Sequence, residues 1–207
     1  MISILNIGNG NVRAFHHILD DLNIANEIID SPEQVEEATH LILPGVGSFD
    51  DVMRRLNDGG FSEKLDLLKK SKQAKILGVC VGMQVMFTSS EEGDLLGLNW
   101  IPGKVKKIHS KDGCGKVFRI PHMGWNSVDS DVGHSLFKGI EKENFYFLHS
   151  YACSPDDKDT IIAKTQFGDH LVAAVQTDNV FGVQFHPEKG HRQGRALLKN
   201  FYGDGNG

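Results

Sequence analysis

The chain has 207 residues, of which 40% are hydrophobic and 24% are charged, and its formal net charge is −5. This composition is ordinary for a soluble globular protein, and the length suffices for one sizeable core or for one core with a small lobe. The negative charge and the lack of a long basic run argue against a nucleic-acid partner, and no apolar stretch is long enough for a membrane span.

The chain contains three cysteines, Cys80, Cys114 and Cys153, which are too widely spaced to form a Cys-x-x-Cys pair. This spacing predicts neither a zinc site nor a disulfide framework, and no pair of histidines has the spacing of a metal-binding helix motif. We therefore expect no metal and no cofactor. The cysteine pattern and the lack of a charged-then-apolar leader after Met1 favour a cytoplasmic location.

In the first part of the chain, short apolar runs alternate with patterns typical of amphipathic helices. We predict strands at residues 2–7, 26–29 and 41–43 and in the run that begins at Lys75, with helices beginning near Asn11, Pro32, Ser48 and Phe61. This alternation implies a largely parallel sheet with helices on both faces, whose ligands bind beyond the carboxyl ends of the strands. The glycine loops at residues 8–11 and 45–47 should therefore converge with the segment around Cys80.

After about residue 97, short β-branched runs replace this pattern and predict antiparallel hairpins. The expected strands are residues 105–109, 117–120, 144–149, 160–166, 171–177 and 180–184, and the chain returns to helix at residues 191–202. We expect one α/β domain over residues 1–203, with a mostly parallel central sheet and an additional antiparallel β-rich section. Residues 204–207 are expected to form a frayed tail.

Cys80 lies in the pattern Gly78-x-Cys80-x-Gly82, which is the nucleophile-elbow pattern with sulfur in place of a serine oxygen. The flanking glycines allow a sharp strand-to-helix turn, and a helix N-terminus favours the thiolate over the thiol. We therefore predict that Cys80 is a nucleophile. The competing interpretation is a buried structural cysteine, which is the commoner use of an isolated cysteine.

His186 and Glu188 end an apolar strand and are separated by Pro187. Residues i and i+2 of an extended chain point to the same side, and a following proline favours the extended conformation at His186. The carboxylate can then hold the imidazole in one tautomer, which gives the cysteine–histidine–carboxylate arrangement of acyl-transfer enzymes. A surface turn at a strand end is the alternative.

The loop that contains Gly45, Val46 and Gly47 follows a predicted strand directly. Glycines leave backbone N–H groups open to a ligand, so this loop and the N–H of Val81 are predicted to bind the oxyanion that forms when sulfur attacks a carbonyl. A plain tight turn into the next helix would also explain the glycines, although not their convergence with Cys80.

Residues 44–47, 78–84 and 186–188 together resemble the class I glutamine amidotransferase family. Residues 121–126 (Pro-His-Met-Gly-Trp-Asn), residues 147–151 and Lys189 narrow this resemblance to the glutaminase subunits of imidazole glycerol phosphate synthases. The resemblance covers nearly the whole chain in order. It implies the flavodoxin-like three-layer fold of that family, with a mostly parallel central sheet.

The resemblance also implies a reaction, in which Cys80 attacks the side-chain amide of L-glutamine and His186 protonates the departing ammonia. Water then hydrolyses the γ-glutamyl thioester to glutamate, while Glu188 orients the histidine. By the same resemblance, the glutamine is held by Gln84, Glu92, Ser150 and Tyr151.

In the family, the ammonia passes to a (β/α)₈-barrel cyclase subunit that makes imidazole glycerol phosphate and AICAR in histidine biosynthesis. The resemblance places Trp125 and Lys189 at the interface with this partner. The chain departs from the family near both regions, since Asn6-Ile7 stands where Asp-Tyr is usual and Gly190-His191 where Ser-Gln is usual.

These departures leave room for a paralogue that supplies ammonia to a different synthase, for example in surface-sugar modification. A free-standing γ-glutamyl hydrolase is another reading with the same triad. A non-catalytic domain on the same fold is a third possibility, because folds are often reused.

Overall fold

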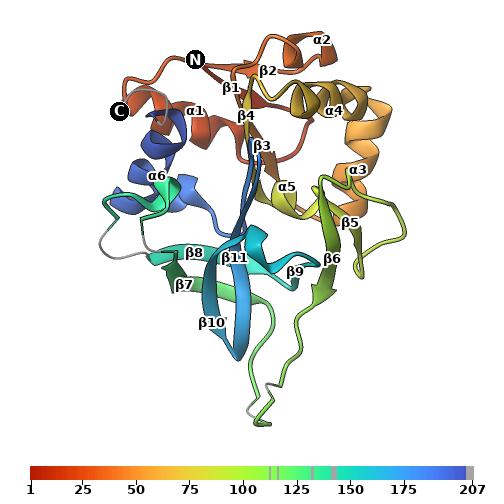
Figure 1. Cartoon of the computed structure of the whole chain (residues 1–207), viewed down its shortest axis with the longest axis vertical. Coiled ribbons are helices and arrows are strands. Elements are labelled where there is room, and N and C mark those ends of the chain that lie inside the picture. Colours follow the sequence, from red (N-terminus) through yellow and green to blue (C-terminus); the bar gives the residue numbers. More distant parts are fainter. Residues whose placement is uncertain (112, 116, 132, 141–143, 204–207) are drawn as a thin grey trace.

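The computed structural model describes residues 1–111, 113–115, 117–131, 133–140 and 144–203. A mixed sheet runs through the molecule (Figure 1), and nine strands are assigned to it among these residues. Their order across the sheet is β2 (Asn26–Ile29), β1 (Ile2–Leu5), β3 (His40–Gly45), β4 (Lys75–Cys80), β12 (Val180–Val183), β11 (Asp169–Thr177), β10 (Ile161–Phe167), β7 (His122–Ser130) and β8 (Asn144–His149).

The strands β2, β1, β3, β4 and β12 are parallel, as the alternation of strands and helices predicts. In Figure 1 this part of the sheet is seen nearly edge-on, with helices on both sides. One side carries α1 (Val12–Asp21) and α6 (Arg192–Gly203); the other carries α3 (Phe49–Asp58), α4 (Phe61–Ser71) and α5 (Val81–Gln84), while α2 (Pro32–Val35) packs on α4. The expected three-layer α/β architecture is thus confirmed.

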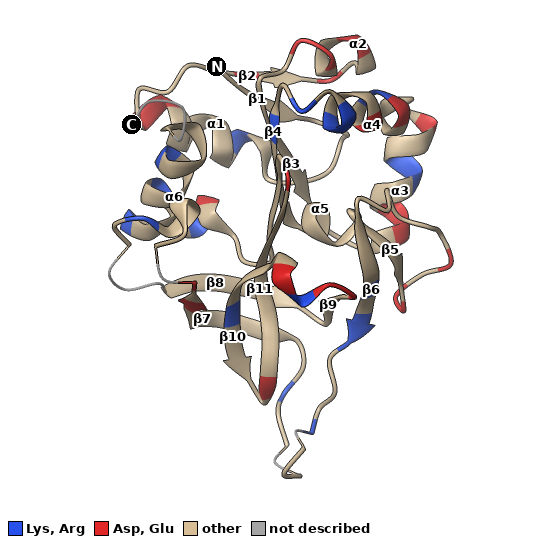
Figure 2. Cartoon of the chain, in the orientation of Figure 1, with Lys and Arg blue, Asp and Glu red and all other residues tan. Residues whose placement is uncertain are grey.

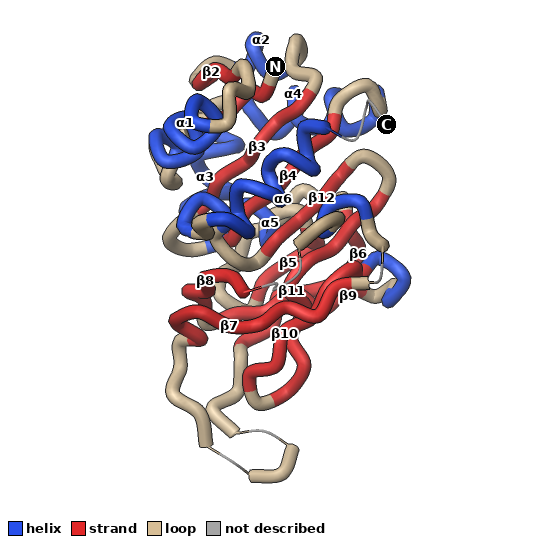
Figure 3. The backbone as a smooth tube through the Cα atoms, turned by 90° about the vertical axis from the view of Figure 1, so that its left-hand side faces the viewer, coloured by secondary structure: helices blue, strands red, loops and turns tan. Residues whose placement is uncertain are grey.

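The antiparallel strands continue the same sheet instead of forming a separate layer (Figure 3). β12 makes this possible because it pairs parallel with β4 on one side and antiparallel with β11 on the other. A smaller sheet of β5 (Phe87–Ser90), β6 (Ile101–Lys107) and β9 (Tyr151–Pro155) lies beside it. Short 3-10 turns occur at η1 (Ser135–Phe137), η2 (Lys158–Thr160) and η3 (Pro187–Lys189).

Several predicted elements differ from the structure. The strand expected at residues 117–120 is wrong, since Val117 forms only an isolated bridge with Lys111 and β7 begins at His122. The strand β9 has no counterpart among the predicted strands. Asn11 precedes α1 but makes no side-chain cap, whereas Ser48 accepts from the Asp51 N–H as expected. The tail predicted at residues 204–207 lies outside the described residues.

The helices pack on the sheet through one apolar stripe each. On α1 this stripe is formed by Val12, Phe15, Ile18 and Leu19, whose spacing of three or four residues puts them on one face. Removing such side chains from water stabilises the fold by about 1.5–3 kcal/mol each. None of the helices among the described residues is long and apolar enough to cross a membrane.

Candidate active site

Cys80 stands at the corner between β4 and α5, and its backbone has φ +57° and ψ −112°. A non-glycine residue with this φ stores strain of about 1–3 kcal/mol, which is a recurrent feature of functional sites. The positions on either side of Cys80 must be glycine, because neighbouring backbone atoms leave no space for a side chain. A Cβ on Gly78 would lie 2.5 Å from the Gly82 carbonyl oxygen, and one on Gly82 would lie 2.0 Å from the Leu43 oxygen.

The helix after the corner differs from the expected one because α5 has only four residues. A helix of one turn contributes little to the macrodipole, so the dipole argument for an ionised Cys80 is weaker than the sequence suggests. The chain goes on directly to β5, which begins at Phe87.

His186 follows β12, the strand beside β4, and is thereby brought to the same end of the sheet as Cys80. Its Nδ1 lies 2.9 Å from Oε1 of Glu188, and the two side chains are 6% and 1% exposed. The backbone N–H of His186 donates to the carbonyl of Tyr146 over 2.8 Å, which ties the histidine to β8. The predicted histidine–carboxylate pair is therefore formed, and it is almost fully buried.

The electrostatics of this pair depend on Cys80. Burial lowers the pKa of His186, but the hydrogen bonds and charges of Cys80 and Glu188 outweigh burial and raise this pKa to about 10. His186 is therefore protonated at neutral pH, and a histidine in that form can donate a proton to a leaving group. Nearby Cys153 is different, because burial and the charge of Cys80 raise its pKa, so it stays a neutral thiol.

The loop at residues 45–47 packs directly against the elbow. A Cβ on Gly45 would lie 2.4 Å from the Gly82 nitrogen, so this glycine allows the close approach of two backbones. Gly47 has φ +91°, a conformation that favours glycine. Both glycines therefore have a structural reason beside any role at the oxyanion.

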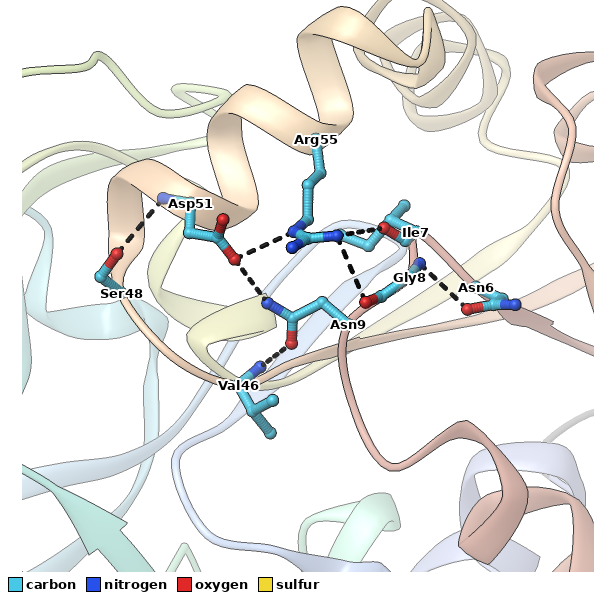
Figure 4. Close-up of polar contacts among 8 residues, drawn as sticks. All are labelled: Asn6, Ile7, Gly8, Asn9, Val46, Ser48, Asp51 and Arg55. Atoms are coloured by element: carbon cyan, nitrogen blue, oxygen red, sulfur yellow. Dashed lines mark hydrogen bonds and ion pairs between the residues drawn. The ribbon is translucent and has the colours of Figure 1, made fainter.

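Figure 4 shows how the same loop is held from outside. The N–H of Val46 donates to Oδ1 of Asn9 over 3.0 Å, and Nδ2 of Asn9 donates to Asp51 over 3.0 Å. Asp51 is paired in turn with Arg55 at 2.9 Å. The predicted oxyanion donor at Val46 is thus occupied by an asparagine side chain that the sequence does not point to.

A cavity of about 500 Å³ opens above Cys80. Its walls include most of the residues that the sequence singles out, namely Cys80, His186, Glu188, Val46, Gly47, Val81, Gln84, Glu92, Ser150, Tyr151 and Lys189. Two predicted site residues are not part of these walls. Gly45 is the last residue of β3 and packs against Gly82, and Trp125 lies on β7 outside the cavity.

The polar side chains in the walls are held in place by further hydrogen bonds. Nε2 of Gln84 donates to the Tyr151 carbonyl at 3.2 Å and to Oε1 of Gln184 at 3.0 Å. Glu92 accepts from the Phe49 N–H at 2.8 Å. Gln184 also places its amide nitrogen 3.8 Å from the Cys80 sulfur, a role the sequence analysis missed. Strand alternation was the available signal, because Gln184 precedes His186 by two positions.

An apolar face lies next to the cavity on β7 and β8. Met123, Trp125 and Leu148 are 64%, 48% and 41% exposed there, and β8 carries no charged residue (Figure 2). Lys189 places its ammonium 4.4 Å from the ring centre of Tyr146 at the edge of this face. Exposed apolar side chains gathered in this way are typical of protein–protein contact sites.

The arrangement provides a nucleophile, a base, an orienting carboxylate and a cavity for a small substrate, which suits acyl transfer through a thioester. Within the described ranges, no group of three or more His, Cys, Asp or Glu side chains is placed to hold a metal ion.

Comparisons with known proteins agree with this geometry. The profile of the family described as "Glutamine amidotransferase class-I" matches residues 3–204. "Imidazole glycerol phosphate synthase subunit HisH" of Leptospira interrogans is 46% identical, over 97% of this chain and 98% of the relative. The protein of the same name from Bdellovibrio bacteriovorus is 44% identical with the same coverage.

The fold is also similar to that of solved structures. One is described as "Crystal structure of glutamine amidotransferase"; it superimposes with a TM-score of 0.74 over 97% of this chain and 98% of its own, at 17% identity. At this identity the likeness concerns the fold alone.

Proposed function

The chain belongs to the class-I glutamine amidotransferase family, and we propose that it is the glutaminase subunit of imidazole glycerol phosphate synthase. It hydrolyses glutamine and supplies the ammonia to a partner subunit in histidine biosynthesis. Relatives that carry this subunit's name match over nearly their whole length at 44–46% identity. This match favours histidine biosynthesis over a different acceptor pathway.

The observation that carries the proposal is that Cys80, His186 and Glu188 line one cavity, with His186 hydrogen-bonded to Glu188 on one side and to Cys80 on the other. The Cys80 sulfur attacks the side-chain carbonyl carbon of glutamine, and His186 gives its proton to the leaving nitrogen. Ammonia departs and leaves a γ-glutamyl thioester. His186 then takes a proton from water, whose oxygen displaces the sulfur, so that glutamate is released, and Cys80 and His186 return to their starting state.

The oxyanion of both steps needs backbone donors near Cys80. We assign this role to the N–H of Val81, at the start of α5, and to the loop at residues 45–47. The Val46 N–H becomes available only when its bond to Asn9 opens. In the described conformation the Val46 N–H therefore does not point at the oxyanion. A partner that moves the loop and frees this N–H would raise the rate of glutamine hydrolysis.

Glutamine itself would be held by the cavity walls. Gln84 and Glu92 would contact the glutamine from one side of the cavity. Ser150 and Tyr151 would contact its amino-acid end from the other side. The hydrogen bonds from Gln84 to Tyr151 and from Phe49 to Glu92 keep these groups in fixed positions before substrate arrives. Such preorganisation reduces the entropy lost on binding.

For the partner we propose a (β/α)₈-barrel cyclase subunit that docks on the apolar face formed by Met123, Trp125 and Leu148. Trp125 meets Tyr146 edge-on with ring centres 5.9 Å apart, and Lys189 covers the same tyrosine. The Tyr146 carbonyl accepts from the backbone of His186. A partner on this face would therefore touch the strand that supports the catalytic histidine.

The deciding experiment is a glutaminase assay with and without the barrel subunit and its nucleotide ligand. We expect a large rise in rate when both are added, and loss of glutamine-dependent activity in Cys80→Ala. The complex of Cys80→Ala should still use free ammonia. Hydrolysis of glutamine by Cys80→Ala would disprove the nucleophile, and a wild-type rate that does not respond to the barrel would disprove the proposed partner.

A further inference from the structure

Two buried histidines next to the cavity have no part in the chemistry described above. His122 on β7 and His149 at the end of β8 are 3% and 6% exposed. They face each other in the antiparallel register, and Nδ1 of His122 lies 2.9 Å from Nε2 of His149. His149 also lines the cavity that contains Cys80.

The neighbours of this pair determine where its hydrogens must be. Nδ1 of His149 lies 2.8 Å from the carbonyl of Tyr151, and a carbonyl only accepts. Nδ1 of His149 must therefore carry a hydrogen. Burial lowers the pKa of His149 to about 3, so the ring is neutral and its Nε2 is an acceptor.

The same reasoning fixes His122. Its Nδ1 must donate to His149, and burial lowers its pKa to about 4, so its Nε2 accepts. The donor is Nδ2 of Asn126 at 3.1 Å. That amide is oriented independently, because the same nitrogen donates to the Gln166 carbonyl at 2.8 Å. The three bonds that link Asn126, His122, His149 and Tyr151 are therefore all donated in the same direction, from Asn126 toward the Tyr151 carbonyl.

The Tyr151 carbonyl links the two histidines, through further hydrogen bonds, to Cys80. This carbonyl also accepts from Gln84, whose nitrogen donates to Gln184, whose nitrogen lies 3.8 Å from the Cys80 sulfur. The neighbouring Ser150 carbonyl is used differently, since it accepts from Ile108 across to β6. The Tyr151 carbonyl thus takes its bonds from side chains, and His149 supplies the shorter of the two.

We propose that His122 and His149 are positioning residues of the glutamine site, and that both hold their hydrogen on Nδ1. They fix the Tyr151 carbonyl, which fixes the Gln84 side chain against the substrate. The inference rests on the proposed function for the identity of the substrate. It assigns no proton transfer to either ring, and its effect falls on substrate binding.

The pair also has a defined place between the outer surface and the cavity. On β7, Met123 and Trp125 point outward onto the apolar face, whereas His122 and Asn126 alternate with them and point inward. The strand that presents the apolar face therefore also carries the outer end of the hydrogen-bond chain.

The test compares two variants that separate the hydrogen bond from the packing of the ring. His122 stacks on Phe147 and Phe167 with ring centres 4.6 Å and 4.2 Å apart. His122→Phe keeps an aromatic ring there but removes the donor to His149. His122→Asn loses the ring but places an amide N–H near the position of Nδ1. Steady-state glutamine kinetics of the assembled complex and imidazole ¹⁵N spectra of the full chain are measured for both.

We expect Nδ1–H tautomers for both rings in the wild type. In His122→Phe the His149 ring should keep its Nδ1–H, because the Tyr151 carbonyl remains, but the ¹⁵N signal of its Nε2 should shift because the donor from His122 is lost. The KM for glutamine should rise about fivefold in His122→Phe, as for one lost hydrogen bond, with kcat within about twofold. His122→Asn should keep the KM near that of the wild type. Circular dichroism confirms that both variants are folded before they are compared.

Nε2–H tautomers in the wild type would overturn the proposal, and so would a KM that rises in His122→Asn but not in His122→Phe, since packing alone would then matter. These outcomes leave the wild-type glutaminase rate intact. A wild-type complex with no glutaminase activity would instead disprove the proposed function.

Discussion

The parallel and the antiparallel parts of the sheet contribute different things to the site. The parallel part supplies Cys80, the proposed nucleophile, at the end of β4 and the glycine loop at the end of β3. Gly45, Gly78 and Gly82 are packed closely against neighbouring backbone there. The antiparallel part supplies the wall of the cavity through residues 148–151 and the apolar face on β7 and β8, and it holds them by side-chain hydrogen bonds.

This contrast indicates a division of labour. Close backbone packing is rigid, so the position of Cys80 should respond little to events elsewhere. Side-chain hydrogen bonds have alternative arrangements, so the antiparallel part is the better place for a partner to act. β12 belongs to both parts, because it pairs with β4 on one side and with β11 on the other. His186 lies just beyond the end of β12, so a change in either part can move its side chain.

The largest expected effect is steric and concerns the parallel part. Gly82→Ala would place a Cβ 2.0 Å from the Leu43 oxygen, so we expect a loss of at least about 3 kcal/mol in the free energy of unfolding, measured with urea. The matched control is Gly139→Ala, where φ is +74° but no atom lies within 4 Å. It should cost only about 1 kcal/mol. Equal losses would contradict the contrast between the two parts.

The second prediction concerns His186, which follows the strand that belongs to both parts. The raised pKa of His186 stabilises the fold below pH 6.5, and this contribution is lost as the pH rises toward about 10. The wild type should therefore lose stability between pH 7 and pH 10 relative to Cys80→Ser, which lacks the sulfur that helps to raise this pKa. Urea unfolding at a series of pH values measures the difference, and parallel curves for the two proteins would refute it.

A smaller effect is expected on the apolar face. Trp125→Ala should weaken binding of the barrel subunit by about 2 kcal/mol, close to thirtyfold in Kd, while the unfolding midpoint of the free chain stays nearly unchanged. Leu67→Ala is a suitable control, because Leu67 is also about half exposed but lies on α4. Titration calorimetry gives both affinities, and an equal loss in the two variants would rule out a specific face.

The smallest effect is expected at the loop after β3. Asn9→Ala removes the acceptor of the Val46 N–H and should raise the glutaminase rate of the chain without its partner by about threefold, at a cost of about 1 kcal/mol in stability. Asn57→Ala is the control, since Asn57 is exposed on α3 and is not among the residues that line the cavity. If the rate falls in Asn9→Ala, Asn9 supports the active loop conformation and does not restrain it.

The two parts also differ in how much of their structure could be predicted from the sequence. In the parallel part the signals are local: the strand at residues 26–29, the Ser48 cap and the elbow at Cys80 each depend on adjacent residues and were predicted correctly. His186 and Glu188 were found for the same reason, because their relation is that of i and i+2 on one chain.

The antiparallel part depends on register, which a single sequence does not contain. The His122–His149 contact joins residues 27 positions apart and follows only from the pairing of β7 with β8. The apolar run at residues 117–120 looks like a strand, yet among the described residues an isolated bridge between Val117 and Lys111 is all the strand pairing that is assigned there, and β7 starts beyond it. Asn9 was missed because a glycine-rich turn gives no sign of which side chain reaches a neighbouring loop.

The position of β12 has a consequence for how the protein is made. Cys80 and Gln184 are 104 positions apart, so β4 leaves the ribosome long before the strand that must insert beside it. Until then the edge of β4 is open, and an open edge invites wrong pairing. Contacts this distant in sequence form late in folding. Cys80 and His186, the proposed nucleophile and base, therefore meet only when nearly the whole described chain has been synthesised, and on this proposal an unfinished chain cannot consume glutamine.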